Sequence, residues 1–179
     1  MENKAGFVTG AGSGIGRASA VEFAKEGAKV IVADIDSEGA KETVAMIESH
    51  GGIASFFKCD VSNEDEVAAL VRETISTFGR LDFAHNNAGI IPQTGLLADT
   101  DSDNWEKVIK VNLTGTYYCL KHSINAMLKF GGGAIVCTSS VAGLMGGRFQ
   151  SSYSTSKWGL NGLVKCAALE YARDGIRIN

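Results

Sequence analysis

The sequence contains little proline, little net charge and no grouped cysteines. Pro92 is the only proline in 179 residues, so glycine and polar residues must end most helices and strands. The net charge of −3 argues against nucleic acid and anionic membrane surfaces as partners. The four cysteines and three histidines lack the spacing of metal ligands, which predicts reduced thiols and no metal site.

Long hydrophobic runs are also absent. No stretch reaches the roughly 18 apolar residues that a membrane-spanning helix needs. The first four residues, Met-Glu-Asn-Lys, lack the charged and then apolar regions of a secretory signal. With 45% hydrophobic and 21% charged residues, the chain can bury one core. We therefore expect a cytoplasmic protein with a single domain over residues 1–179.

Short apolar runs alternate with segments of helical length. The runs predict five parallel strands, at Ala5–Thr9, Lys29–Asp34, Ala54–Asp60, Leu81–His85 and Ala134–Thr138. The segments between them predict helices over Gly14–Glu26, Ser37–Ser49, Glu64–Phe78 and about Asp103 to Phe130. Ser37 and Ser62 are the expected N-caps of the second and third helices. This alternation predicts an α/β fold, a doubly wound parallel sheet of Rossmann type with helices on both faces.

The last part of the chain continues the same pattern. A further helix is predicted from about Ser152 to Arg173, and Ile176–Asn179 begins a sixth strand. A parallel strand is normally buried on both faces, so a chain that stops within it leaves an open sheet edge. We therefore expect a fragment, truncated after the start of the sixth strand.

Glycines cluster where the first strand should turn into the first helix. In the run from Thr9 to Gly16, backbone N–H groups would face an anion at the helix N-terminus. Such a run also fits a merely tight turn, or the nucleotide or methyl-donor site of another family. Asp34 follows about 20 residues later, where a carboxylate can bind ribose hydroxyls and repel a 2′-phosphate. This favours NAD over NADP, although Asp34 also fits a simple charge at the start of the next helix.

Tyr153 and Lys157 lie four positions apart in the last predicted helix, and so on one face of it. A nearby ammonium and a helix N-terminus both stabilise a phenolate, which would let Tyr153 exchange protons near neutral pH. The same spacing is also common on an amphipathic helix with a solvated lysine. The pair becomes informative only with its neighbours.

Taken together, the motifs resemble those of the short-chain dehydrogenase/reductase family. The shared features, in the family's order, are Thr9 to Gly16, Asn86-Asn87-Ala88-Gly89, Asn112, Ser139-Ser140 and Tyr153-x-x-x-Lys157. The resemblance spans essentially the whole chain. It implies an NAD(P)-binding Rossmann domain and an oxidoreductase acting on CH–OH groups, which transfers a hydride between NAD and a secondary alcohol or its ketone.

The resemblance also implies roles for catalytic residues. Tyr153 would exchange a proton with the substrate oxygen, and Lys157 would assist it and hold the nicotinamide ribose. Ser140, rather than Ser139, would hydrogen-bond the reacting oxygen, and Asn112 would hold a water that links Lys157 to solvent. The implied cofactor contacts are Gly10, Ser13, Gly14, Ile15, Gly16, Asp34, Asp60, Val61, Asn87, Ala88, Gly89, Tyr153 and Lys157.

Several neighbouring residues receive simpler interpretations. Asn86 is expected to tie strands together, and Arg17, the only cation near the glycines and Asp34, to be a helix-surface residue. Arg148 fits a solvated side chain better than a contact to an anionic substrate. Ile91 to Leu97 and Val141 to Gln150 are expected to line part of the substrate pocket.

The family resemblance implies a homo-oligomer, usually a tetramer, for the intact protein, with a small alcohol or ketone as substrate. A truncated, non-catalytic nucleotide-binding fragment is the alternative. A methyltransferase fits less well because it leaves Tyr153, Lys157, Ser140 and Asn112 unexplained.

Overall fold

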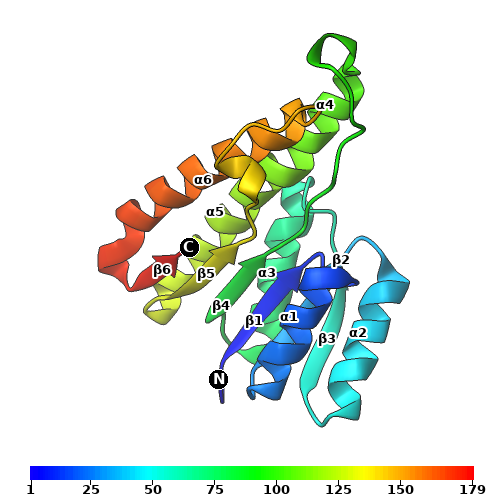
Figure 1. The fold of residues 1–179 in the computed structure, drawn as a ribbon. Helices are drawn as coiled ribbons and strands as arrows, with labels where there is room; N and C mark the ends of the chain where they lie inside the picture. The colour runs from blue at the N-terminus through cyan, green and yellow to red at the C-terminus, as the bar shows by residue number, and fades with distance from the viewer.

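Six parallel strands form the centre of the molecule (Figure 1). The structure is a computed structural model that describes residues 1–179. The strands are β1 (Ala5–Thr9), β2 (Lys29–Asp34), β3 (Ile53–Lys58), β4 (Phe83–Asn86), β5 (Gly133–Cys137) and β6 (Ile176–Ile178). Their order is β3-β2-β1-β4-β5-β6, and every neighbouring pair is parallel. The predicted doubly wound sheet is thus confirmed, with strand ends shifted by a residue or two.

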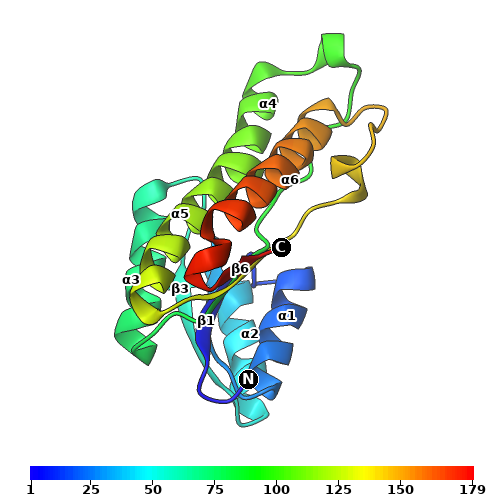
Figure 2. The same cartoon turned by 90° about the vertical axis from the view of Figure 1, so that its left-hand side faces the viewer.

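Helices cover both faces of this sheet (Figure 2). One face carries α1 (Gly14–Lys25) and α2 (Ser37–Ser49). The other carries α3 (Glu64–Phe78), α5 (Gly115–Met127) and α6 (Ser151–Tyr171), while α4 (Ser102–Ile109) precedes α5 and extends beyond the ends of the strands. Short 3₁₀ turns lie at Leu97–Asp99, Leu128–Phe130, Val141–Gly143 and Ala172–Asp174. The predicted helices are present at their expected places, except that the segment from Asp103 to Phe130 is not one continuous helix.

Alternate residues of the strands enter two separate cores. Phe7 and Ile31 are fully buried in the core beneath α3, α5 and α6. Val8, which follows Phe7, and Val30, which precedes Ile31, are fully buried in the core beneath α1 and α2. Successive side chains of a strand point to opposite faces. A strand buried on both faces must therefore be apolar at every position, which explains the uninterrupted apolar runs.

The predicted N-caps Ser37 and Ser62 are wrong. Asp36 caps α2 by accepting a hydrogen bond from the Glu38 amide at 3.1 Å, while Ser37 is already in the helix. Asn63 caps α3 by accepting one from the Asp65 amide, also at 3.1 Å. In both cases an Asp or Asn stands at the extended residue just before the first turn, where its planar oxygen reaches the N–H two residues on.

The helix predicted from Asp103 to Phe130 is interrupted in the middle. A π-helical turn at Lys110–Thr114 separates α4 from α5 and contains Asn112, which is fully buried. Directly after it, Gly115 packs so closely that a Cβ there would lie 2.9 Å from Cγ2 of Val61. A π-helical turn inside a long helix is a frequent mark of a functional site.

Candidate functional site

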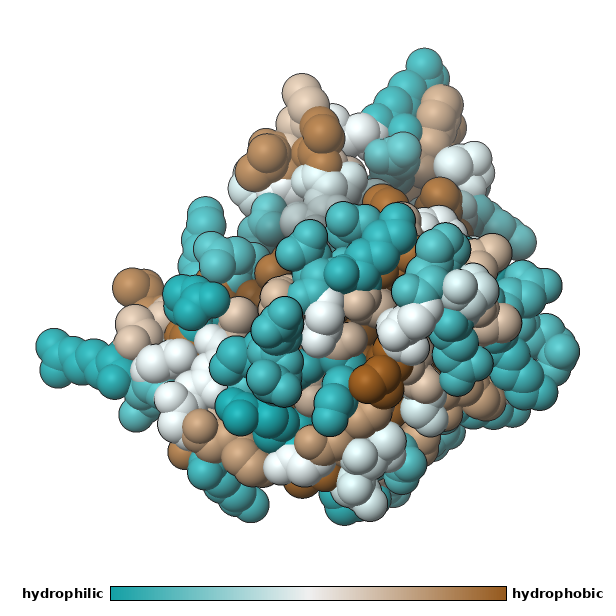
Figure 3. Space-filling model, turned by 90° about the horizontal axis from the view of Figure 1, so that it is seen from below, coloured by the Kyte–Doolittle hydropathy of each residue, from teal (hydrophilic) through white to brown (hydrophobic).

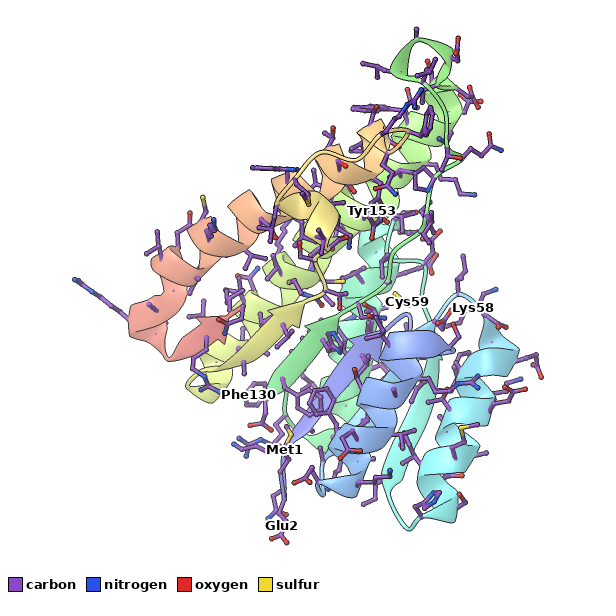
Figure 4. All side chains as sticks on the ribbon, in the orientation of Figure 1. Met1, Glu2, Lys58, Cys59, Phe130 and Tyr153 are labelled. Atoms are coloured by element: carbon purple, nitrogen blue, oxygen red, sulfur yellow. The ribbon has the colours of Figure 1, made fainter.

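A cleft of about 1250 Å³ opens at the carboxyl ends of the strands. The chain leaves β1 toward one face of the sheet and β4 toward the other, so these neighbours form the point where ligands bind in open α/β sheets. Tyr153 and Cys59 lie at this upper end in Figure 4, and Met1, Glu2 and Phe130 at the lower end. That lower end is largely hydrophilic, with scattered hydrophobic residues (Figure 3).

Most of the predicted site residues line this cleft. Those that do are Gly10, Ser13, Gly14, Ile15, Asp34, Asp60, Val61, Asn87, Ala88, Gly89, Ser140, Tyr153 and Lys157. Gly16 and Asn112 do not. The folded chain therefore brings together residues from both ends of the sequence.

The glycine turn is tightly packed against its surroundings. Gly10 and Gly14 have φ of 63° and 51°, the left-handed region that favours glycine. A Cβ on Gly16 would lie 2.1 Å from the Gly10 carbonyl oxygen, so Gly16 acts by close packing beneath the turn. The first turn of α1 holds no acidic residue and Ser13 makes no capping bond, which leaves its N–H groups available for an anion.

Asp34, at the end of β2, is fixed by backbone donors. Its Oδ2 accepts from the Gly12 amide at 2.7 Å and its Oδ1 from the Asp36 amide at 2.9 Å. Each carboxylate oxygen has a further lone pair. Asp34 can therefore accept more hydrogen bonds from a ligand in the cleft without moving.

Arg17, the nearest cation to the glycine turn, is occupied elsewhere. Its guanidinium donates to the Gly12 and Gly39 carbonyls, and its Nε to Thr43 Oγ1 at 3.0 Å. It also pairs with Glu42 at 3.0 Å. Arg17 thus joins α1, the glycine turn and α2, and does not line the cleft.

Asp60 and Val61 extend the cleft beyond the end of β3. Asp60 Oδ1 accepts from the Ser62 amide at 2.9 Å, and the Asp60 amide donates to Glu66 at 2.8 Å. Ile35 lies on the same wall and is 61% exposed. An apolar side chain left open in the cleft provides a surface for a flat ring.

Tyr153 and Lys157 lie on α6 at the opposite end of the cleft from Asp34. Lys157 is 4% exposed, and its Nζ lies 5.7 Å from the centre of the Tyr153 ring. The Nζ donates to the Thr138 carbonyl at 2.7 Å. Burial lowers the pKa of Lys157, because the charged form loses solvation.

Replacing Lys157 with methionine should increase the free energy of unfolding at neutral pH. The pKa of Lys157 is lowered in the folded state, so the penalty of burying its charge is fully present below that pKa. The penalty disappears as the pH rises toward the ordinary lysine value. Urea denaturation should therefore show a gain in K157M that shrinks in alkali.

Lys165→Met, an exposed position on α6, is the control for Lys157→Met and should change stability little at any pH. A K157M protein less stable than the wild type at neutral pH would show that the Thr138 hydrogen bond outweighs the burial penalty.

The two serines after β5 are used differently. Ser139 donates to Asn161 Oδ1 at 2.7 Å, so its hydrogen is taken. Ser140 Oγ accepts from the Ala142 amide at 3.1 Å, which leaves its hydroxyl hydrogen free to donate. This difference supports the choice of Ser140 over Ser139.

Asn112 lies behind the cleft wall. Its Oδ1 accepts from the Ile90 amide at 2.8 Å, and its Nδ2 donates to the Ile90 carbonyl at 3.0 Å. The side chain thus holds the segment after β4 against the π-helical turn. Both the oxygen and the nitrogen of the Asn112 side chain are therefore already bonded to Ile90. The link from Asn112 to Lys157 through a water stays a prediction.

Asn87 ties strand ends together as well as lining the cleft. Its Nδ2 donates to the Thr9 and Gly10 carbonyls at 3.2 and 3.4 Å, and its Oδ1 accepts from Thr138 at 3.1 Å. The side chain of Asn86 makes a single weak hydrogen bond, to Cys137 Sγ at 3.5 Å. The tying role expected of Asn86 is thus carried more strongly by Asn87.

One wall of the cleft was not anticipated from the sequence. A polar face of α4 and the following turn supplies Asp103, Glu106, Lys107 and Lys110, and the apolar Val111 adjoins it. Their spacing of three and four residues is a helical signal, but without the tertiary structure it fits a solvated face equally well. Thr138, Cys59 and Ile90 also line the cleft.

The two predicted substrate segments differ. Ile91 lines the cleft, whereas no residue of Val141 to Gln150 does. Arg148 lies 4.5 Å from the centre of the Phe149 ring. Near Val141 to Gln150, the residues that line the cleft are Ser139 and Ser140, which directly precede this segment.

The cysteines have no site of their own. No group of three potential metal ligands occurs. Burial, reinforced by Glu66 and Asp60, raises the pKa of the Cys59 thiol to about 12, so it stays protonated at neutral pH. Cys119 and Cys137 are also buried, and Cys166 is exposed.

None of the helices is long and apolar enough to cross a membrane.

An open parallel sheet with a glycine turn at its switch point defines a Rossmann-type fold. The sequence profile of the family described as short chain dehydrogenase matches residues 4–179. The chain belongs to this family. It is therefore an oxidoreductase of a family that acts on hydroxyl groups with a nicotinamide cofactor.

Individual relatives agree with this assignment. The chain is 44% identical to a cyclohexanol dehydrogenase of Acinetobacter sp. (strain SE19), covering 100% of this chain and 71% of the relative. It is 43% identical to a 3beta-hydroxysteroid dehydrogenase of Mediterraneibacter gnavus, covering 100% and 64%.

Solved structures are similar over the same length. Levodione reductase superposes with a TM-score of 0.97 at 38% identity, covering 100% of this chain and 70% of that chain. NAD⁺-bound xylitol dehydrogenase gives a TM-score of 0.97 at 35% identity, covering 99% and 68%.

Proposed function

We propose that residues 1–179 form a single NAD-binding domain that transfers a hydride between NAD and a secondary alcohol or its ketone. One observation carries the proposal: Tyr153, Lys157 and Ser140 line one end of the cleft whose other end holds Asp34 and the glycine turn. Relatives named for cyclohexanol and a 3beta-hydroxysteroid, both secondary alcohols, support this substrate class.

The residues of the cleft fit a dinucleotide. The glycine turn and the uncapped start of α1 would hold the pyrophosphate, and Asp34 the adenosine ribose. Ile35 and Val61 supply apolar surface beside Asp34 for the adenine. When bound, NAD supplies the nicotinamide carbon that accepts or gives the hydride.

The residues at the other end would handle the proton. In alcohol oxidation, the Tyr153 phenolate takes the hydroxyl proton, and in ketone reduction the phenol returns it. The free Ser140 hydrogen donates to the same substrate oxygen. The Lys157 ammonium has three N–H groups and gives one to Thr138, which leaves two for the hydroxyls of the nicotinamide ribose.

Asp34 should also select NAD over NADP. In Asp34→Asn, loss of the negative charge should lower the NAD-to-NADP affinity ratio by about 10- to 100-fold, the effect of one charged hydrogen bond. Isothermal titration with each cofactor measures the ratio. Arg17 is already held by four groups, so its guanidinium is not free to bind a 2′-phosphate in the wild type.

Asp36→Asn is the matched control for Asp34→Asn, because it removes a charge two residues away and keeps a good N-cap. It should leave the affinity ratio unchanged. If both variants changed the affinity ratio equally, the cofactor preference would depend on the total negative charge of this loop. Asp34 would then have no specific role in selecting NAD.

The test of the function is NADH formation by the purified chain with NAD and a panel of secondary alcohols that includes cyclohexanol. Titration of NAD binding accompanies it. Turnover that requires NAD supports the proposal. Binding of NAD without turnover of any alcohol would instead identify a non-catalytic nucleotide-binding module.

The expected homo-oligomer belongs to the same proposal. Tyr117 on α5 and Trp158 and Leu169 on α6 are exposed by 44%, 54% and 83%, and these helices lie side by side in Figure 2. Exposed apolar side chains of this size support a protein contact on this side. The mass of the chain in solution, from light scattering, measures it.

A further inference from the structure

A chain of side-chain hydrogen bonds crosses the carboxyl ends of three strands. It starts at His85 on β4, whose Nε2 lies 2.9 Å from Thr138 Oγ1, directly after β5. Thr138 Oγ1 lies 3.1 Å from Asn87 Oδ1. Asn87 Nδ2 then reaches the Thr9 and Gly10 carbonyls at the end of β1. The chain therefore connects His85 to the glycine turn by way of Thr138.

The orientation of Asn87 sets the direction of every bond in this chain. Its amide nitrogen must face the two carbonyl oxygens at β1, because an oxygen there would meet only other acceptors. Its Oδ1 therefore accepts the hydroxyl hydrogen of Thr138. A hydroxyl has one hydrogen, so Thr138 Oγ1 can only accept from His85, which must carry its hydrogen on Nε2.

The surroundings of His85 agree with a neutral ring in this tautomer. The side chain is 8% exposed, and its Nδ1 is buried without a hydrogen-bond partner. A hydrogen on Nδ1 would be left unpaired. Burial also lowers the pKa of His85, which keeps the ring uncharged at neutral pH.

Thr138 is also the residue that holds Lys157. Its carbonyl accepts from Lys157 Nζ at 2.7 Å, and no other hydrogen-bond partner of that ammonium is present among the residues of the chain. Since β5 ends at Cys137, Thr138 lies outside the sheet, with only its amide bonded back to the Asn86 carbonyl, at 3.0 Å. The side-chain bonds to His85 and Asn87 add to this amide bond in fixing the orientation of Thr138.

We propose that His85 is a positioning residue for Lys157: it orients Thr138, whose carbonyl holds the ammonium in the cleft. The inference rests on the proposed function, because Lys157 matters to catalysis only if the cleft performs hydride transfer. The hydrogen-bond chain itself is independent of any activity.

Two substitutions of His85 separate the effect of the hydrogen bond from that of packing, and a third variant changes Thr138. His85→Leu has a side chain of similar size without a donor. His85→Gln has an N–H group at the same number of bonds from Cα as Nε2, so it should restore the bond to Thr138. Thr138→Val removes the hydroxyl and keeps the carbonyl that Lys157 uses.

NMR tests the arrangement without turnover. Long-range ¹H–¹⁵N spectra of the three histidines, with His85 assigned from His85→Gln, should show a neutral Nε2–H ring at neutral pH. The Cε signal of Lys157 in a ¹³C-lysine sample, assigned with Lys157→Met, should move in His85→Leu and return in His85→Gln. A charged ring, an Nδ1–H tautomer or an unmoved Lys157 signal would overturn the proposal.

Kinetics tests the consequence. In His85→Leu, kcat with NAD and cyclohexanol should fall by about three- to tenfold, the effect of one neutral hydrogen bond, with a smaller change in KM for NAD. His85→Gln should recover most of the loss. Both Thr138→Val and His85→Leu remove the bond between His85 and Thr138. Adding Thr138→Val to His85→Leu should therefore cost only what the bond from Thr138 to Asn87 contributes, less than the sum of the two single effects.

The outcomes distinguish the inference from the function. An unchanged kcat in a folded His85→Leu protein, or failure of His85→Gln to recover it, would overturn the positioning role while leaving hydride transfer in place. A wild type without turnover would overturn the proposed function, and the two NMR signals would then still decide whether His85 orients Thr138 and Lys157.

Discussion

Tyr153→Phe should lower kcat by about 10²- to 10⁴-fold, the usual contribution of a positioned general acid or base. The substitution removes only the phenolic oxygen, while the ring and Lys157 beside it remain. Neither the glycine turn nor Asp34 changes. NAD affinity, measured by titration, should therefore stay close to the wild-type value.

Tyr171→Phe is the control for this variant, because Tyr171 ends α6 and does not line the cleft. It should retain full turnover. If Tyr153→Phe kept its turnover, the proton would be handled by another group. If instead it lost NAD binding with turnover, Tyr153 would act in binding and the assigned role would be wrong.

Gly16→Ala should disable the cofactor end of the cleft. A Cβ at Gly16 would lie 2.1 Å from the Gly10 carbonyl oxygen and 2.7 Å from Asn87 Nδ2. The first of these is backbone, so the glycine turn itself must move. Overpacking of this kind typically costs about 1–3 kcal/mol of stability. NAD affinity should also fall by about tenfold or more, since each 1.4 kcal/mol of strain in the bound turn is a factor of ten.

Gly162→Ala is the corresponding control. A Cβ at Gly162, on the exposed side of α6, meets nothing within 4 Å. Replacing a glycine in a helix interior should stabilise the protein by about 0.5–1 kcal/mol, and NAD affinity should not change. Urea denaturation and NAD titration measure both effects. Wild-type affinity in Gly16→Ala would mean that the turn does not bind the cofactor.

The sequence was sufficient to predict the sheet, because parallel strands buried on both faces appear as continuous apolar runs. Residues that line the cleft follow these runs directly, as Asp34 follows Ala33 and Asn87 follows β4. Their meeting at one edge of the sheet requires only that parallel strands share a direction. This part of the site could therefore be predicted without coordinates.

Details of local geometry were less accessible. The caps Asp36 and Asn63 compete with adjacent serines that have almost the same propensity, and only the backbone conformation decides between them. The π-helical turn at Lys110–Thr114 has no signature in a single sequence, because its residues fit an ordinary helix equally well. Sequence reasoning accordingly gave one continuous helix.

The role of His85 could not be predicted from the sequence. In the sequence it is an isolated histidine, 53 residues from Thr138. The two come together because β4 and β5 pair with His85 opposite Val136, which brings Thr138 to the end of the same pair. A contact that depends on strand register and on a buried ring nitrogen requires the folded structure.

The most direct test of hydride transfer uses cyclohexanol that carries deuterium on the carbon bearing the hydroxyl. The protein, NAD and this alcohol are incubated together, and the reduced nicotinamide is analysed by mass spectrometry. We predict that deuterium appears in the nicotinamide ring of the product, and that Tyr153→Phe forms almost none. Cyclohexanone formed while the nicotinamide carries no deuterium would contradict direct hydride transfer in the cleft.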